Sequence, residues 1–185
     1  MVSKMSGVLA VLVLGLFGGV VAADTTSEIK QARDTIAAFK AADPGLSRFF
    51  ANAVGYAVFP TVKKGAVGIG GASGSGILFE KGKPTGRATL GQVTVGAQLG
   101  GQTYSEVIFF ESAPPLNDFK AGTMALAAQW SAVAASKGAS DSAKYQDGVA
   151  VFTTRKGGLM FEASVGGQKF KFEPFPTKSG ASSGK

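Results

Sequence analysis

The sequence predicts an α+β domain in which N-terminal helices pack on a strongly curved or barrel-like, mostly antiparallel, glycine-rich sheet. Helical patterns are confined to the beginning of the chain, and a run of strand patterns follows. Within the stretch 56–79, every even position from 66 to 76 is glycine or alanine. Because a strand alternates its faces with period two, one face of this strand carries almost no side chain.

The first 23 residues have the form of an export signal. Lys4 supplies the positive end, residues 7–21 are nearly all apolar, and Val21-Ala22-Ala23 is a small-residue cleavage motif before Asp24. A membrane span needs about 20 apolar residues, so a cleaved leader is favoured, with an uncleaved anchor as the alternative. We therefore expect a signal peptide at 1–23, a single domain at 24–173 and a disordered Pro-, Ser- and Gly-rich tail at 174–185. The protein is expected in the periplasm or secreted, with peripheral attachment to a membrane.

Two helices are predicted after the leader. Thr25 and Glu28 have the spacing of a capping box, and the helix that follows extends to about Lys40. Asp43-Pro44 predicts a second, short helix that ends near Asn52. The first helix has a narrow apolar stripe, which favours packing on the core. The alternative is a membrane-contact helix formed by Ile29, Lys30, Arg33, Ile36, Phe39 and Lys40.

Strand patterns occupy most of the remaining chain, at 54–59, 66–79, 87–99, 104–111, 149–154, 158–165 and 169–173. Residues 81–84 form a turn, and residues 116–120 form about one helical turn. The stretch 123–135 is ambiguous, because its alanines favour helix while Met124, Leu126, Ala128, Trp130 and Ala132 share a period-two face. We predict a strand there, and a polar loop at 137–148.

The bare strand face predicts a close approach to a neighbouring element. Glycine inside a strand usually marks a sharp bend or close contact with a backbone, side chain or ligand. Packing is the favoured interpretation of the face that Gly68, Gly70, Gly74 and Gly76 form, and binding of a ligand there is the alternative.

The composition excludes several kinds of chemistry. The chain has neither cysteine nor histidine, so zinc sites built on these residues and Ser-His-Asp or Cys-His catalysis are impossible. The carboxylates are few and scattered, without a close pair suited to glycoside hydrolysis or to a hard-metal cage. We therefore expect a protein that is not an enzyme and that holds neither a cofactor nor a metal.

The charge favours anionic partners. The chain has 19 basic and 12 acidic residues and a net charge of +7. Nucleic acid does not suit an exported protein, whereas anionic lipid, anionic glycan or an acidic protein does. Two segments, 58–65 and 151–157, resemble each other and read as strand-turn-strand units with two cations at each turn. The head-group candidates are therefore Lys63, Lys64, Arg155 and Lys156.

The order of these blocks resembles the SYLF domain family. The resemblance begins with AVGYAVFPTVKKGAVGIGGASGSG within 52–79, continues through 88–101 and SEVIFF at 105–110, and ends with GVAVFTTRKGGLMFEASVGG at 148–167. It implies a lipid-binding domain that prefers phosphoinositides or other anionic phospholipids, with actin binding in some eukaryotic relatives, including the yeast proteins. Actin is not an expected partner of an exported bacterial member, and protein partners remain unidentified.

The expected function is non-catalytic binding of anionic phospholipid at a membrane surface. The alternative is a structural or protein-interaction module of the cell envelope without specific lipid binding.

Overall fold

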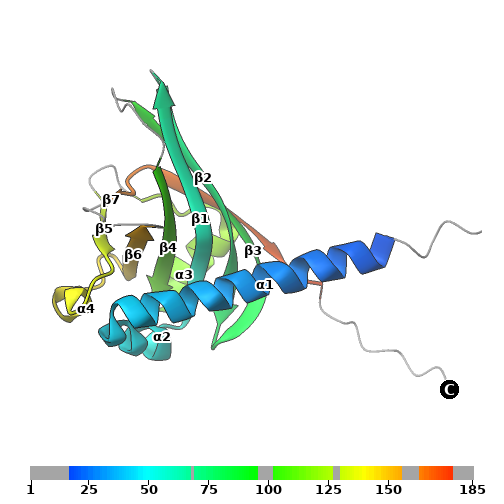
Figure 1. Cartoon of the computed structure of the whole chain (residues 1–185), viewed down its shortest axis with the longest axis horizontal. Coiled ribbons are helices and arrows are strands. Elements are labelled where there is room, and N and C mark those ends of the chain that lie inside the picture. The colour runs from blue at the N-terminus through cyan, green and yellow to red at the C-terminus, as the bar shows by residue number, and fades with distance from the viewer. Residues whose placement is uncertain (1–16, 68, 96–101, 127–129, 156–162, 177–185) are drawn as a thin grey trace, which may run out of the picture.

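A computed structural model describes residues 17–67, 69–95, 102–126, 130–155 and 163–176. Its elements are α1 (Phe17–Ala42), the 3-10 helix η1 (Pro44–Leu46), α2 (Ser47–Asn52), β1 (Gly55–Val67), β2 (Ile69–Glu80), β3 (Lys83–Val95), β4 (Gln102–Phe110), α3 (Ala113–Ala121), β5 (Ser131–Ala134), α4 (Ala139–Ser142), β6 (Val149–Arg155), β7 (Ala163–Ser164) and β8 (Gln168–Pro174). Figure 1 shows the N-terminal helices crossing one side of the sheet. The predicted α+β class is confirmed.

Eight strands form one sheet in the order β7-β5-β6-β4-β1-β2-β3-β8. Neighbouring strands are antiparallel except β5 and β6, which are parallel. Only residues 165–167 connect the two edge strands, β7 and β8. Since three residues span a short distance, the sheet bends far enough to bring its edges near each other. No ladder joins β7 to β8 among the described residues, so the sheet is strongly curved but open, and closure into a barrel is not found.

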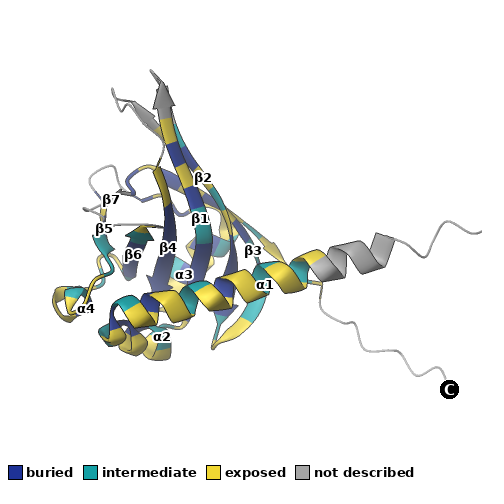
Figure 2. Cartoon of the chain, in the orientation of Figure 1, coloured by how far each residue is buried: buried dark blue, intermediate teal, exposed yellow. Residues whose placement is uncertain are grey.

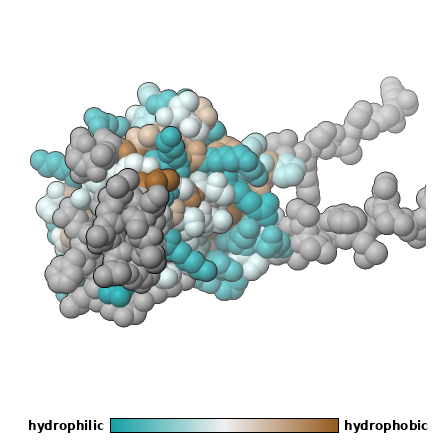
Figure 3. All heavy atoms as spheres, turned by 90° about the horizontal axis from the view of Figure 1, so that it is seen from above, coloured by the Kyte–Doolittle hydropathy of each residue, from teal (hydrophilic) through white to brown (hydrophobic). Residues whose placement is uncertain are grey.

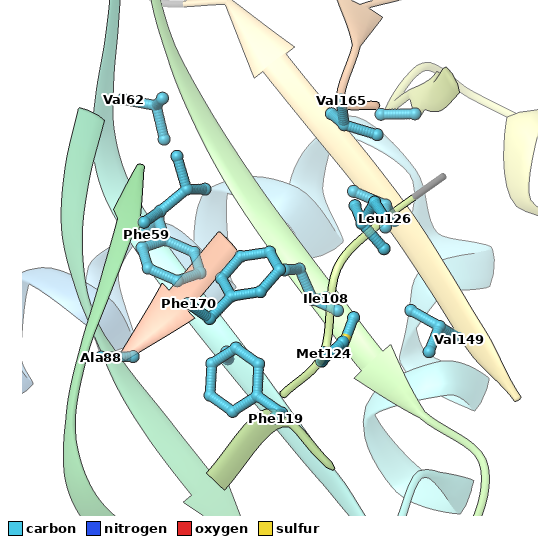
Figure 4. Packing of buried hydrophobic residues seen from close by; sticks show 14 of the residues in the cluster. Phe59, Val62, Ala88, Ile108, Phe119, Met124, Leu126, Val149, Val165 and Phe170 are labelled. Atoms are coloured by element: carbon cyan, nitrogen blue, oxygen red, sulfur yellow. The ribbon is translucent and has the colours of Figure 1, made fainter. Parts of the chain in front are cut away.

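The inner, concave face of the sheet holds the larger core cluster. The aromatic ring of Phe119 on α3 lies 5.1 Å from that of Phe110 and 5.0 Å from that of Phe170. Figure 4 shows Phe59, Phe119 and Phe170 pointing toward one another inside the curved sheet. Other members include Ala57, Val62, Leu78, Leu90, Ile108, Met124, Leu126, Trp130, Ala132, Val151 and Val165. Burying a side chain of the size of Leu or Phe contributes roughly 1.5–3 kcal/mol.

The outer face is covered at one end by α1, η1 and α2. Phe39 and Ala32 on α1 are fully buried, and the ring of Phe49 on α2 lies 5.0 Å from Phe152 and 5.4 Å from Phe109. Figure 2 shows buried residues where the central strands pass behind the helices. The central strands therefore read as continuous apolar runs at 56–59 and 107–110, because both of their faces are covered.

The predicted break after residue 59 is wrong. β1 continues to Val67, and Pro60 lies at a one-residue bulge where the register shifts against both β2 and β4. Proline has no N–H to donate, and a bulge removes the need for one. The Ser105 hydroxyl donates to the Pro60 carbonyl oxygen over 2.8 Å. Lys63 and Lys64 consequently lie inside a strand, and the β1–β2 connection comes five residues after Lys63, at position 68.

The predicted capping box is also wrong, because α1 is already helical at Phe17. Thr25 and Glu28 instead bind Arg87 on β3, with N–O distances of 2.7 Å and 2.5 Å. The second predicted start is confirmed, since the Asp43 carboxylate accepts a hydrogen bond from the Gly45 N–H over 3.1 Å.

The C-terminal half differs from expectation in the lengths of its elements. α3 is a nine-residue helix that ends at Gly122 in the left-handed conformation, φ 72°. Among the described residues of the stretch 123–135, only Ser131–Ala134 form a strand. Met124, Leu126, Trp130 and Ala132 are all buried, as their period-two pattern indicates, and Ala128 lies outside the described residues. The loop 137–148 contains the short α4. β8 extends to Pro174, and the Phe175 N–H donates to the Thr85 carbonyl, so the chain remains attached to the sheet beyond residue 173.

Two glycines of β2 lie against the bulged part of β1. A Cβ atom on Gly76 would overlap the Val58 carbonyl oxygen and lie 2.8 Å from Phe59 Cδ1. A Cβ atom on Gly74 would lie 3.0 Å from the Thr61 carbonyl oxygen. Gly70 lies on β2 opposite Ala66 and Thr94, and Gly68 lies outside the described residues.

We expect Gly76→Ala to lower the free energy of unfolding by about 1–3 kcal/mol, because the added methyl group displaces the β1 backbone. In a domain of this size, about 2–4 °C of melting temperature is lost per kcal/mol. The matched control is Gly91→Ala on β3, where a Cβ atom would meet nothing within 4 Å. That variant should melt within about 2 °C of wild type. Equal melting temperatures for the two variants would contradict the close approach.

Candidate functional site

Three strands project beyond the body of the molecule at one end. The described part of β4 begins opposite Lys64, and β8 begins opposite Gln92. Beyond these positions β1, β2 and β3 pair only with one another among the described residues. We define the tip as residues 65–67, 69–71 and 93–95, which rise at the top of Figure 1. Val93 is 76% exposed, one of two large apolar side chains that are exposed in the described part of the chain.

Lys63 and Lys64 point to opposite faces of β1 just below the tip. Lys63 is exposed on the outer face, whereas Lys64 is only 9% exposed on the inner face. The bulge determines this arrangement, because one extra residue exchanges the two faces for the rest of the strand. Of the predicted pair of adjacent head-group cations, Lys63 is therefore exposed and Lys64 is buried.

Arg155 is exposed at the end of β6 and pairs with Tyr104 on β4. Tyr104 also pairs with Val62 on β1, so Arg155 lies two strand spacings, about 10 Å, from β1 beside Lys63. Lys156 lies outside the described residues. The two cation-bearing segments are not equivalent hairpins, because β5 lies between β6 and β7.

A buried polar cluster occupies the inner face below the tip, and it consists of Lys64, Gln92, Tyr104, Glu106, Thr153 and Gln168. Glu106 is fully buried, and its carboxylate accepts a hydrogen bond of 3.0 Å from the Gln168 side chain across the concave face. Burial raises the pKa of Glu106 to about 7, against the opposing effects of that hydrogen bond and of the Lys64 charge. A carboxyl group near half-ionisation thus lies within the domain at neutral pH.

The apolar stripe of α1 faces the sheet. Phe39 is fully buried, and Ile29 and Ile36 pack against the outer core cluster. The polar positions of the predicted membrane-contact helix are exposed: Lys30 pairs with Asp34 at 2.7 Å, Lys40 lies 5.0 Å from the Phe50 ring centroid, and Arg33 faces solvent. In this fold the apolar stripe therefore packs on the outer core cluster of the sheet.

A groove of about 660 Å³ lies between α1 and the uncovered part of the outer sheet face. Arg87 closes the side of the groove next to α1, because its guanidinium group donates hydrogen bonds to Thr25 and Glu28. The Asp24 carboxylate oxygen lies 3.8 Å from the Arg87 Nη2 atom. Lys63 lines the groove on β1, and Lys171 lines it on β8.

Neither Glu106 nor the groove was predicted from the sequence. Glu106 had a signal, because it is an acid within the apolar strand 104–110 and shares a face with Tyr104 and Ile108. The groove had no local signal, since its lining comes from α1, β1, β2, β3 and β8.

The described part of the chain contains no group of three or more histidine, cysteine, aspartate or glutamate side chains that could hold a metal ion. None of the described helices is long and apolar enough to span a membrane.

No family model matches the chain. The chain is similar to a protein of Aeromonas veronii named "Beta cell expansion factor A", with 29% identity over 129 residues. The aligned part covers 69% of this chain and 49% of that protein, so the chain spans about half the length of this relative.

We expect Glu106→Gln to flatten the pH dependence of stability. The pKa of the carboxyl group is about 7 in the fold, against an ordinary 4.5. Between these values the unfolded chain releases a proton that the folded chain keeps, so the free energy of unfolding falls as the pH rises. The loss in the free energy of unfolding reaches its full size of about 3 kcal/mol above pH 7, and it is absent below pH 4.5.

Urea unfolding at pH 4.5, 6 and 8 measures this effect. The stability of Glu106→Gln relative to wild type should rise between pH 4.5 and 8 by up to about 3 kcal/mol. Glu111→Gln, at an exposed acid just after β4, is the control and should follow wild type. Parallel curves for wild type and Glu106→Gln would show that Glu106 does not titrate in this range.

Proposed function

We propose that this protein binds anionic phospholipid surfaces without catalysing a reaction, and that it docks end-on through the tip. The proposal includes membership of the SYLF family, which the chain resembles, and export to the periplasm or the cell exterior. The carrying observation is that Lys63 and Arg155 are exposed at the end of the sheet from which the tip projects.

The two cations flank the tip from different sides. Lys63 points to the outer face of the sheet, and Arg155, directly opposite the inward-facing Tyr104, emerges from the inner side. A flat anionic surface that meets the tip end-on therefore approaches both charges. Each cation near an anionic membrane contributes about 1 kcal/mol.

The spacing between Lys63 and Val93 along the strands matches the thickness of the head-group layer of a membrane. Lys63 lies in one row across the sheet with Ser73 and Gly91, and Val93 lies two residues, about 7 Å, farther toward the tip. The head-group layer on each side of a bilayer is about 5–8 Å thick. When Val93 reaches the apolar layer, Lys63 lies among the phosphates. The tip segments themselves are rich in small and apolar residues and carry no charge.

The surface around the tip supports this orientation. Figure 3 looks onto this end of the molecule and shows hydrophilic side chains spread around a few hydrophobic ones. This combination of an apolar contact and surrounding polar groups is typical of peripheral attachment to the membrane interface.

The first test removes the two cations. Lys63→Ala with Arg155→Ala should weaken binding to phosphatidylglycerol vesicles by about 2 kcal/mol, or roughly 30-fold. Vesicle co-sedimentation measures the affinity, and binding by wild type should fall steeply as salt rises. The matched control is Lys83→Ala with Lys144→Ala, which removes two exposed cations from the opposite end of the molecule. Equal losses in both double variants, or equal binding of wild type to phosphatidylcholine vesicles, would refute end-on docking on anionic lipid.

The second test removes the apolar contact. Val93→Ser should reduce vesicle affinity about tenfold, because an inserted valine side chain contributes roughly 1.5 kcal/mol or more. The salt dependence should be unchanged, since no charge is altered. The melting temperature is the control for folding and should stay near that of wild type, because Val93 is exposed. Unchanged affinity would mean that the tip does not reach the apolar layer.

A further inference from the structure

The groove between α1 and the tip has a floor of hydroxyl groups in a regular row. Thr61 on β1 pairs with Ser75 on β2, Ser75 pairs with Thr89 on β3, and Thr89 pairs with Lys171 on β8. Side chains that are directly opposite on neighbouring strands lie side by side, with Cβ atoms about 5 Å apart. Three hydroxyls and an ammonium group thus cross the groove at one strand spacing each.

A second row lies one step nearer the tip and is more open. It contains Lys63, Ser73 and Gly91 on β1, β2 and β3. A Cβ atom on Gly91 would meet no other atom within 4 Å, so nothing fills the space above β3 at this position. The two rows together give a shallow, polar floor with room above it.

The charges of the groove leave one cation without an ion pair. Glu28 is bound to Arg87 at 2.5 Å, and Glu173 is bound to Lys171 at 2.7 Å. Lys63 has no ion-pair partner among the described residues and is exposed at the β1 side. Five charged side chains line the groove, with a net charge of +1, so a negatively charged ligand is favoured near Lys63.

We infer that the groove binds an acidic oligosaccharide about three sugar units long. Hydroxyl side chains both donate and accept hydrogen bonds, as sugar hydroxyls do, and their spacing is close to the length of one pyranose unit. The methyl group of Thr89, which is exposed, offers contact to the C–H face of a sugar. Lys63 forms an ion pair with a carboxylate or phosphate on the ligand. A cavity of about 660 Å³ lies within the size range of small-ligand sites.

This ligand differs from the lipid of the proposed function. The hydroxyl row would contact only the oligosaccharide, so the two kinds of binding can be tested separately. The tip and Arg155 take no part in the groove, and Ser75 and Thr89 lie on the side of Lys63 away from the tip. Removing the Ser75 and Thr89 hydroxyls therefore affects the oligosaccharide and leaves lipid attachment unchanged.

The probe is trigalacturonic acid, a trimer of uronate sugars, titrated into the protein at low salt by calorimetry. Wild type should bind it at least tenfold more tightly than neutral maltotriose or monomeric galacturonic acid. Lys63→Ala should weaken binding at least tenfold, and Ser75→Ala with Thr89→Val should do the same without altering the charge. Lys83→Ala, at the far end of β3, is the control and should bind like wild type.

Vesicle binding by the Ser75→Ala, Thr89→Val variant distinguishes this inference from the proposed function. Normal binding to phosphatidylglycerol together with lost trigalacturonate binding supports an oligosaccharide groove. Trigalacturonate binding by a wild-type protein that ignores vesicles would overturn only the proposed function. Absent trigalacturonate binding, equal binding of maltotriose, or full binding by the hydroxyl variant would overturn the inference. Loss of vesicle binding in the hydroxyl variant would overturn it too, because the groove would then hold a lipid head group.

Discussion

The bulge at Pro60 is the constraint on which the arrangement of this end of the molecule depends. One extra residue in β1 shifts its register against β2 and β4 at the same place. Before the bulge Ala57 and Phe59 point inward, and after it Val62 and Lys64 do. The exchange of faces places Lys63 on the outer groove and Lys64 beside Glu106. Because a bulge also bends its strand, it contributes to the curvature that separates the inner from the outer face.

Two glycines of β2 leave room for the bulged backbone of β1. Gly74 and Gly76 lie where the β1 backbone comes closest, and a Cβ at Gly76 would overlap the Val58 carbonyl oxygen. Their inward side is filled by Phe59 and Val62, while the intervening Ser73 and Ser75 face the groove. The same alternation therefore gives a tightly packed inner side and an open, hydroxyl-bearing outer side.

The polar interior below the tip has a different physical character from the core around it. Glu106 and Gln168 meet across the concave face because the curvature brings β4 and β8 toward each other, although β1, β2 and β3 lie between them in the sheet. Thr153 pairs with Glu106, and Gln92 pairs with Gln168, so each member of the cluster is held by a neighbouring strand. A buried carboxyl group held in this way makes stability sensitive to pH near neutrality.

The sequence by itself determined the class of fold, the second helix start at Asp43, the positions of most strands and the burial of Met124, Leu126, Trp130 and Ala132. Each of these depends on local patterns: capping, turn chemistry and period-two alternation. It also showed the absence of cysteine and histidine, which limits the chemistry of any site. These features needed no knowledge of which strand lies beside which.

Only the tertiary structure decided which cations are exposed at the same end of the sheet. Lys63 and Lys64 are neighbours in the chain, yet a strand sends them to opposite faces, and only the bulge determines which one is buried. Arg155 comes to the same end of the sheet as Lys63 because β6 and β1 both pair with β4, although β6 follows β1 only after many intervening residues. The capping pair Thr25 and Glu28 binds Arg87 because α1 crosses the sheet there. Such contacts arise from register and curvature, which short-range sequence patterns do not encode.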